Sequence, residues 1–390
     1  MRTVLFCHSL LSDWNHGNAH FLRGVVTELQ ARGHDVRVYE PRDAWSVLNL
    51  VADAGAAALD EVRTVYPSLE CRRYDEATLD LDEALDGADL VLVHEWNTPA
   101  LVQRIGRHRA RGGRYALLFH DTHHRSVSAP QEMARYDLDA YDGVLAFGEV
   151  IRERYVANGW SRRAWTWHEA ADARVFRPRA DRSGTEPGAY DHHLVWIGNW
   201  GDDERSQELR DFLIEPVRQL GLRARIHGVR YPDAAKAELA AAGIEYAGWL
   251  PNYRAPAVFA RAAVTVHVPR RPYVEALPGI PTIRVFEALA CGIPLVSCWW
   301  DDREGLFTRG RDYLSVRARA DMTAALRAVL NDGGLAASLA RHGRETILNR
   351  HTCAHRVEEL LTIVESGLGR SARREAGAAP GLAPAKAFTI

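Results

Sequence analysis

The feature that most constrains this chain is the alternation of short apolar runs with stretches whose apolar residues recur at helical spacing. The first run covers residues 3–9, and the helical stretch after it closes at Arg32-Gly33. Near-continuous apolar runs that end in polar residues are typical of parallel strands covered on both faces. The other predicted strands are residues 35–40, 88–95, 114–121, 143–149, 193–199, 223–229, 244–249, 263–269 and 294–298. The pattern predicts an α/β protein.

A stretch rich in Arg, Pro, Gly and Asp, residues 173–193, divides the alternation into two series. We therefore expect two doubly wound, Rossmann-like domains, residues 1–175 and 190–345, facing each other across a cleft. A long helical stretch is predicted over residues 334–367, with residues 346–368 packing back towards the N-terminal domain. The tail, residues 369–390, has no apolar period and is predicted to be disordered.

Composition excludes several classes of function. The 390 residues are 47% hydrophobic and carry a formal net charge of −2, so nothing favours nucleic-acid binding. The apolar runs are strand-sized, and no integral membrane span is expected. The five cysteines are scattered without a CxxC pair, which is typical of a reduced, cytoplasmic protein.

One helix carries charge in an unusual place. Residues 282–291 read TIRVFEALAC, and Thr282 can cap the helix that follows it. Arg284 and Glu287 are almost the only polar residues in this helix, and their spacing puts them on the same face. They are either a surface ion pair or a pair that faces a ligand, for which the free N–H groups of a helix N-terminus are suited.

A histidine-rich segment follows the strand at residues 114–121. It reads His120-Asp121-Thr122-His123-His124, and three readings stay open: a metal site, a catalytic or sugar contact at His120, and structural capping. Alternate residues of an extended segment point in opposite directions, which disfavours the metal reading.

Several motifs stand in the order of one known family. RVFEALACGIPLVSC resembles the donor-binding helix of retaining "group 1" GT-B glycosyltransferases, and LLFHDTHH and WTWHEAADARVFRP resemble other segments of that class. The resemblance covers roughly residues 1–365. PTIRVFEALACG together with WIGNWGDDERSQELRDF is especially similar to the CgeB-like, spore-maturation-protein-type branch. The resemblance implies the GT-B fold and a bacterial source.

The resemblance implies a set of donor contacts. Glu287 corresponds to the residue that contacts ribose hydroxyls, and Arg205 is the basic residue that neutralises a diphosphate. Gly279 departs from the family pattern, because an acidic residue usually stands there. The predicted donor-binding residues are Gly198, Asn199, Trp200, Arg205, Trp249, Leu250, Gly279, Ile280, Thr282, Arg284 and Glu287. Plain turns and loops are the alternative at residues 198–201 and 249–252.

The resemblance also implies a catalytic and an acceptor set. The family's His contacts the donor sugar near the reacting carbon, so His120 and Asp121 are predicted to be catalytic. The predicted acceptor-side residues are His16, Gly17, Asn18 and His94.

The function implied is a hexosyltransferase that moves a sugar from a nucleotide sugar, with UDP-sugar favoured, to an acceptor glycan, lipid or small molecule. Retention and chemistry without metal or cofactor are expected, and peripheral membrane contact stays open. Two alternatives remain: a GT-B sugar-nucleotide epimerase, and a non-catalytic nucleotide- or sugar-binding spore or envelope protein, which the Gly279 departure favours.

Overall fold

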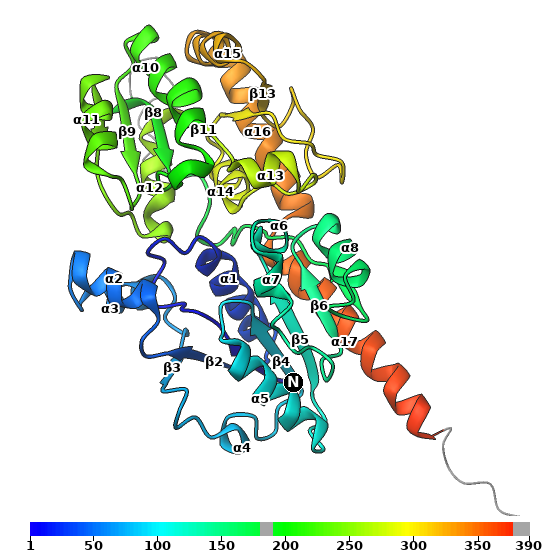
Figure 1. The fold of residues 1–390 in the computed structure, drawn as a ribbon. Helices are drawn as coiled ribbons and strands as arrows, with labels where there is room; N and C mark the ends of the chain where they lie inside the picture. Colours follow the sequence, from blue (N-terminus) through cyan, green and yellow to red (C-terminus); the bar gives the residue numbers. More distant parts are fainter. Residues whose placement is uncertain (180–189, 377–390) are drawn as a thin grey trace, which may run out of the picture.

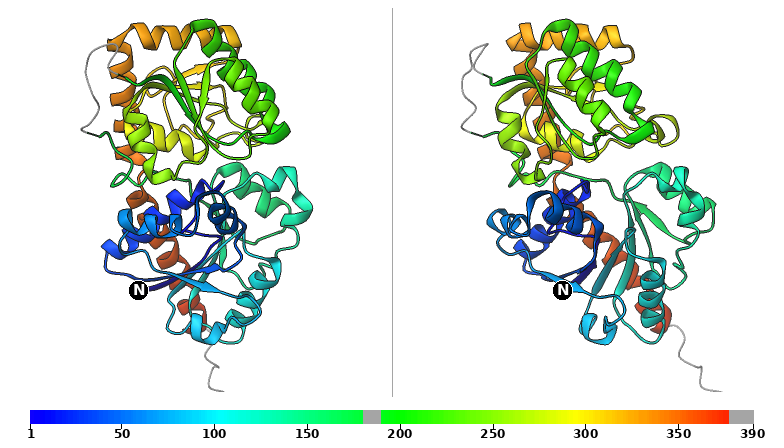
Figure 2. Two further views of the ribbon diagram at one scale, coloured as in Figure 1. Left: turned by 90° about the vertical axis from the view of Figure 1, so that its left-hand side faces the viewer. Right: turned by 60° about the vertical axis from the view of Figure 1, so that its left-hand side comes forward.

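The structure is a computed structural model that describes residues 1–179 and 190–376. The chain forms two lobes, each built on one parallel sheet flanked by helices (Figure 1). Figure 2 shows the same two lobes from other directions, with the C-terminal helix running along the N-terminal lobe. The prediction of an α/β chain with two doubly wound sheets is confirmed.

The N-terminal sheet has the strand order β3-β2-β1-β4-β5-β6-β7, and every neighbouring pair is parallel. Its strands are β1 Arg2–Phe6, β2 Asp35–Pro41, β3 Cys71–Tyr74, β4 Leu90–His94, β5 Ala116–Asp121, β6 Gly143–Ala146 and β7 Ala164–Thr166. Strand order reverses beside β1, between β2 and β4. In sheets of this kind ligands bind outside the carboxyl ends of the strands at such a reversal.

The C-terminal sheet has the order β10-β9-β8-β11-β12-β13 and is also parallel throughout. Its strands are β8 His192–Ile197, β9 Ala224–His227, β10 Ile244–Tyr246, β11 Ala262–His267, β12 Leu295–Cys298 and β13 Leu314–Val316. Here the order reverses beside β8.

The helices connect and cover the strands. In the N-terminal lobe they are α1 Asn18–Ala31, α2 Trp45–Ala54, α3 Ala58–Val65, α4 Leu81–Ala84, α5 Pro99–Ala110, α6 Arg125–Ser128, α7 Pro130–Met133 and α8 Glu149–Ala157. In the C-terminal lobe they are η1 Asp202–Glu204, α9 Ser206–Leu209, η2 Arg210–Ile214, α10 Glu215–Leu220, α11 Asp233–Ala241, η3 Asn252–Arg254, α12 Ala255–Ala260, α13 Arg271–Glu275, α14 Ile283–Cys291 and α15 Arg319–Asn331. The last two are α16 Gly333–Arg350 and α17 Cys353–Ala376.

Sequence periodicity located ten of the strands and missed β3, β7 and β13. The strand β3 reads CRRY, and its two arginines hide it from an apolar pattern. The helical segment after η1 is divided by a π-helical segment, η2, between α9 and α10. The helical stretch expected over residues 334–367 is divided into two helices, α16 and α17. The chain turns between them at His351 and Thr352, where Thr352 forms a β-bridge with Ala171.

The C-terminal helix α17 packs on α1 of the N-terminal domain. Gly24 makes this close approach possible, because a Cβ there would lie 2.4 Å from the Cys353 sulfur. The predicted tail begins inside this helix, which continues to Ala376; residues 377–390 lie outside the described residues, as do residues 180–189 of the predicted linker.

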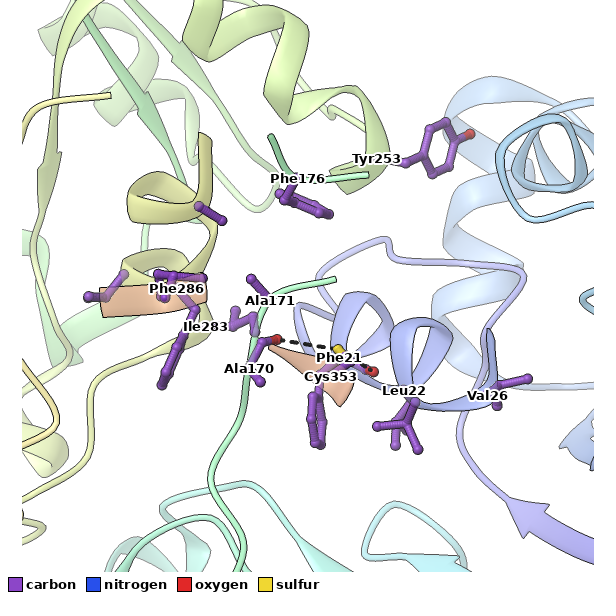
Figure 3. Close-up of a cluster of buried hydrophobic side chains, with 14 of the residues drawn as sticks. Phe21, Leu22, Val26, Ala170, Ala171, Phe176, Tyr253, Ile283, Phe286 and Cys353 are labelled. Atoms are coloured by element: carbon purple, nitrogen blue, oxygen red, sulfur yellow. Dashed lines mark hydrogen bonds between the residues drawn. The ribbon is translucent and has the colours of Figure 1, made fainter. Parts of the chain in front are cut away.

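One apolar cluster joins the two lobes. Figure 3 shows Phe21 and Leu22 of α1 on one side and Ile283 and Phe286 of α14 on the other, with Cys353 near α1. The Cys353 thiol lies 3.8 Å from the Phe21 carbonyl oxygen and 3.9 Å from that of Ala170. The contact between α1 and α14 holds the two carboxyl edges of the sheets opposite each other.

Candidate functional site

A cavity of about 450 Å³ lies between the carboxyl edges of the two sheets. The loops after β1, β4 and β5 line it from the N-terminal domain, and the loops after β8, β9, β10 and β11 line it from the C-terminal domain. Of the predicted site residues, these line the cavity: His16, Gly17, Asn18, Gly198, Asn199, Arg205, Trp249, Leu250, Thr282 and Arg284. The topology thus brings most of the expected residues to one place.

Three arginines converge on the C-terminal wall. Arg205 donates to the Asn199 carbonyl oxygen at 2.7 Å and to the Val268 carbonyl oxygen at 3.1 Å, and its guanidinium lies over the Trp196 ring. Burial and the positive charges of Arg270 and Arg284 lower the pKa of Arg205 to about 9. A group of cations that disfavour one another's charge is a site suited to an anion.

The N-terminus of α14 also points an electropositive end at this wall. Thr282 occupies the cap position, but its hydroxyl makes no capping hydrogen bond and lies 3.1 Å from His267 Nε2 instead. The expectation that Thr282 caps this helix is therefore wrong. The first N–H groups of the helix are left without a cap from Thr282, and such groups bind anions.

Glu287 lies behind Arg284 and does not line the cavity. Its side chain is 0% exposed; one carboxylate oxygen is 2.9 Å from His20 Nδ1, and the other accepts from Arg284. The Asp172 N–H donates to His20 Nε2 at 2.9 Å, so Nδ1 carries the proton that is donated to Glu287. Glu287 does not face the cleft in this structure, because its two carboxylate oxygens contact His20 of the N-terminal domain and Arg284 of its own helix; its contact with ribose stays a prediction.

The loops that carry Trp249 and Asp13 are fixed by a buried hydrogen-bond network between the domains. Trp249 donates through Nε1 to Asp13 at 3.2 Å, and Arg23 pairs with Asp13 at 2.9 Å and with Asn252 at 2.8 Å. Gly228 is required beside them, because a Cβ there would lie 1.9 Å from the Gly198 carbonyl oxygen. This network holds Trp249 and Leu250 at the cavity wall.

The N-terminal wall is aromatic and carries neutral imidazoles. Trp45 and Trp96 line the cavity and are 37% and 36% exposed, which is high for such large apolar side chains. Burial lowers the pKa of His8 to about 4 and that of His16 well below its usual value. These imidazoles are therefore uncharged at neutral pH, whereas the arginines on the C-terminal wall are cationic.

The predicted catalytic residues lie behind this wall. Asp121 is fully buried and accepts from the Tyr155 hydroxyl at 2.8 Å, and burial with the nearby Glu95 charge raises its pKa well above the usual value. His120 packs against Trp167 and the His94 ring, and burial lowers its pKa to about 3. Neither lines the cavity, and neither does His94, whose Nε2 lies 3.2 Å from Thr122 Oγ1. His123 and His124 line it instead.

Three predicted donor residues are also displaced from the cavity. Gly279 has φ +94°, and a Cβ there would lie 2.5 Å from Glu304 Oε1, so the position excludes an acidic side chain. Ile280 and Trp200 are buried in hydrophobic clusters. Glu304 itself pairs with His168 Nε2 at 3.0 Å and accepts from the Glu149 N–H at 2.9 Å, linking the domains.

Sequence reasoning assigned no role to several residues that line the cavity, among them His8, Trp45, Glu169, Gly228, His267 and Arg270. Arg270 and His267 stand at and after the end of a predicted strand, a signal that could have found them. Glu169 and Gly228 had no such signal, because only the fold brings them to the wall. Among residues 1–179 and 190–376 no three His, Cys, Asp or Glu side chains are arranged to hold a metal ion, and no helix there is long and apolar enough to cross a membrane.

Comparison with known proteins decides the fold. Sucrose-phosphate synthase from Thermosynechococcus elongatus matches with a TM-score of 0.62 at 14% identity, covering 97% of this chain and 100% of that one. HepE from Anabaena in complex with UDP matches with a TM-score of 0.67 at 12% identity, covering 94% and 100%. The fold is GT-B. An alpha-glucosyltransferase in complex with UDP and a 13-mer DNA matches equally well, with a TM-score of 0.67 at 11% identity, covering 94% and 99%.

A family described as "Glycosyl transferase-like" matches residues 205–362 of this GT-B chain. The matched range begins at Arg205 and includes α14. No curated protein matches the chain. The predicted GT-B architecture is confirmed, and part of the C-terminal half is similar to the glycosyl transferase-like family.

Proposed function

We propose that this GT-B protein transfers a sugar from a UDP-sugar to an acceptor bound on the N-terminal wall. The observation that carries the proposal is that Arg205, Arg270 and Arg284 line the same cavity as the N-terminus of α14, where Arg270 pairs with Glu204 and Arg284 with Glu287. A diphosphate supplies the negative charge that this arrangement favours. Similar GT-B structures that contain UDP, from Anabaena HepE and an alpha-glucosyltransferase, favour uridine as the base.

The proposed assignment follows the cavity from base to sugar. Trp249 and Leu250, beside Gly228, hold the base, and Arg205 with Asn199 and Gly198 holds the diphosphate. Arg284 and the N–H groups of α14 hold the phosphate next to the sugar, while Glu287 orients Arg284 through their ion pair. The sugar then lies between α14 and the Gly17 loop, where the acceptor enters past Trp45 and Trp96.

Electrostatic stabilisation of the leaving group would supply most of the catalysis. A bond forms between the acceptor oxygen and the anomeric carbon, the bond from that carbon to the β-phosphate oxygen breaks, and the acceptor proton passes to a phosphate oxygen. The three guanidinium groups and the helix dipole stabilise the charge that develops on the UDP. Retention of configuration and independence from divalent metal remain parts of this proposal.

A nucleotide screen tests the proposal. Thermal unfolding and calorimetry with UDP, GDP, ADP and dTDP should show that UDP stabilises the protein, by roughly 2.7 kcal/mol at a concentration of one hundred times Kd. UDP-sugars are then incubated with acceptor mixtures, and UDP release is followed. Interconversion of the UDP-sugar without an acceptor would indicate an epimerase, and binding of UDP with no turnover in any mixture would indicate a binding protein. Failure of every nucleotide to bind would overturn the proposed function.

A further inference from the structure

Glu169 is a buried carboxyl group inside the cavity that the proposed mechanism does not use. It lies on the segment that follows β7 and leads out of the N-terminal domain. Its side chain reaches the cavity wall although the residue is only 6% exposed. A buried carboxyl group that faces a ligand cavity needs a physical explanation, because burial disfavours its ionised form.

The carboxyl group is held at the anion-binding end of α14. Asn18 donates to Oε1 at 3.1 Å, and the backbone N–H of Ile283, the first residue of that helix, opposes the rise of the carboxyl group's pKa. Glu169 thus lies at the cavity wall with Asn18 of one domain and the first turn of α14 of the other. It stands where we propose that the sugar-linked phosphate binds.

A second observation points to a ligand at the same place. The Asn18 side-chain oxygen is buried and has no hydrogen-bond partner among the described residues, and Asn18 lines the cavity. Unpaired polar atoms in buried positions are rare in folded proteins, since each costs about 1–3 kcal/mol. A bound molecule with a hydroxyl group or a protonated oxygen would satisfy this oxygen.

The charges around Glu169 favour its neutral form. Burial and the Glu287 charge on α14 together raise the pKa of Glu169 to about 8, against the opposing effects of Asn18, Arg284 and the Ile283 N–H. Tyr273 of α13 also interacts with it electrostatically, and α1 presents the uncharged Asn18 side chain. At pH 7 the group therefore holds a proton that it can donate.

We propose that Glu169, in its protonated form, donates a hydrogen bond to a phosphate oxygen of a nucleoside diphosphate at the N-terminus of α14 and so sets the upper pH limit of binding. This inference rests on the proposed function, because it assigns a further contact within the same site. An ionised carboxylate at this position would repel the diphosphate, whereas a neutral carboxyl group adds a donor beside Arg284. The diphosphate in turn opposes loss of the proton.

Calorimetric titration of UDP at pH 7 and pH 9 tests the inference on the full chain. If the complex keeps the proton, a group with a pKa of about 8 weakens UDP binding about tenfold between these pH values. Glu169→Gln keeps a neutral hydrogen-bond donor of the same size. The Kd of this variant for UDP should therefore lack the tenfold change between pH 7 and pH 9 that Glu169 causes in the wild type. The ionisation of UDP and of the arginines is shared by all variants and cancels in the ratio to wild type.

Glu40→Gln is the matched control. Glu40 is also a buried carboxyl group whose pKa is raised by burial, but it accepts from the Leu10 N–H at 2.8 Å and does not line the cavity. This variant should keep the wild-type pH dependence. Circular dichroism establishes folding, and if Glu169→Gln does not fold, Glu169→Ala serves instead: its binding should be weaker at pH 7 and equally flat.

The outcomes separate this inference from the proposed function. A tenfold weakening in wild type and in Glu40→Gln, absent in Glu169→Gln, supports the role of Glu169. UDP binding with the same pH dependence in wild type and Glu169→Gln overturns that role and leaves the proposed function standing. No UDP binding to wild type at either pH overturns both.

Discussion

The two walls of the cavity are built from the same architecture and differ in charge. Each is the carboxyl edge of a parallel sheet at a reversal of strand order. The C-terminal wall presents Arg205, Arg270 and Arg284, whereas the N-terminal wall presents Trp45, Trp96 and imidazoles with lowered pKa values, among them His8 and His16. The comparison teaches that the fold supplies only the position of the site, and the loops after each strand supply its chemistry.

The difference also divides the proposed reaction. The cationic wall suits the diphosphate, which is charged before and after transfer. The neutral, aromatic wall suits an acceptor that needs no counter-charge, because flat rings offer rigid apolar surface. The changes below are made in one wall, in the residues behind it, or in the link between the walls, in order of decreasing expected effect.

The largest effect is expected where the two walls are joined, at the buried pair of His20 and Glu287. Glu287→Ala leaves the buried His20 N–H unpaired and should lower the free energy of unfolding by about 3–5 kcal/mol, measured in urea. Glu287→Gln keeps an acceptor oxygen for His20, so its free energy of unfolding should fall by less. Normal stability combined with loss of UDP binding in either variant would restore the predicted ribose contact and contradict the linking role.

Removal of Arg205 should affect the cationic wall alone. Arg205→Ala is expected to weaken UDP binding about a hundredfold, because a hydrogen bond to a charged group contributes about 1.5–3 kcal/mol. Arg218→Ala removes an exposed arginine from α10 that pairs with Glu215, so UDP affinity should not change. Equal losses in the two variants would mean that net charge, not the arginine wall, governs binding.

The buried imidazoles should make the N-terminal wall sensitive to acid. The folded-state pKa of His120 is lowered by burial to about 3, below the unfolded value of 6.5, so the unfolded chain binds the proton first. Stability is full above pH 6.5 and falls with pH towards 3; His120 alone costs about 2 kcal/mol between pH 7 and pH 5.

His120→Asn removes that titration and should shrink the loss measured by urea unfolding at the two pH values. His342→Asn changes a histidine on α16 that lies away from the cavity, and the loss should stay as in wild type. An unchanged loss in His120→Asn would show that another group causes the acid sensitivity.

The smallest effect on UDP affinity is expected from substitutions in the aromatic, N-terminal wall. Trp45→Ala should change UDP affinity less than twofold while raising the acceptor KM, by about five- to tenfold if the ring supplies about 1 kcal/mol. Leu48→Ala truncates another exposed side chain of α2 that does not line the cavity, and both quantities should stay at wild-type values. Weaker UDP binding in Trp45→Ala would break the division between the walls.

The sequence predicted the fold far better than the details of the site. Long buried strands such as β4 and β5 are recognisable in the sequence as apolar runs. The order of the motifs along the chain predicted the GT-B fold. The direction of individual side chains was not predictable. His120 and Asp121 end a buried strand, yet packing against Trp167 and Tyr155 turns them away from the cavity.

Glu287 illustrates why predictions of side-chain direction fail. Spacing correctly placed it with Arg284 on one helical face, but its partner His20 lies 267 residues away in the other domain. No local pattern contains that contact. Glu169 stands in the quoted segment WTWHEAADARVFRP but received no role for the same reason, since Asn18 meets it only in the folded chain.

A crystal structure of the protein with UDP would show directly which wall binds the nucleotide. We expect the diphosphate within hydrogen-bond distance of Arg205, Arg284 and the first N–H groups of α14, with the base against Trp249 and Leu250. A nucleotide bound among His8, His16 and Trp45 on the N-terminal wall, with the arginines unengaged, would contradict that expectation.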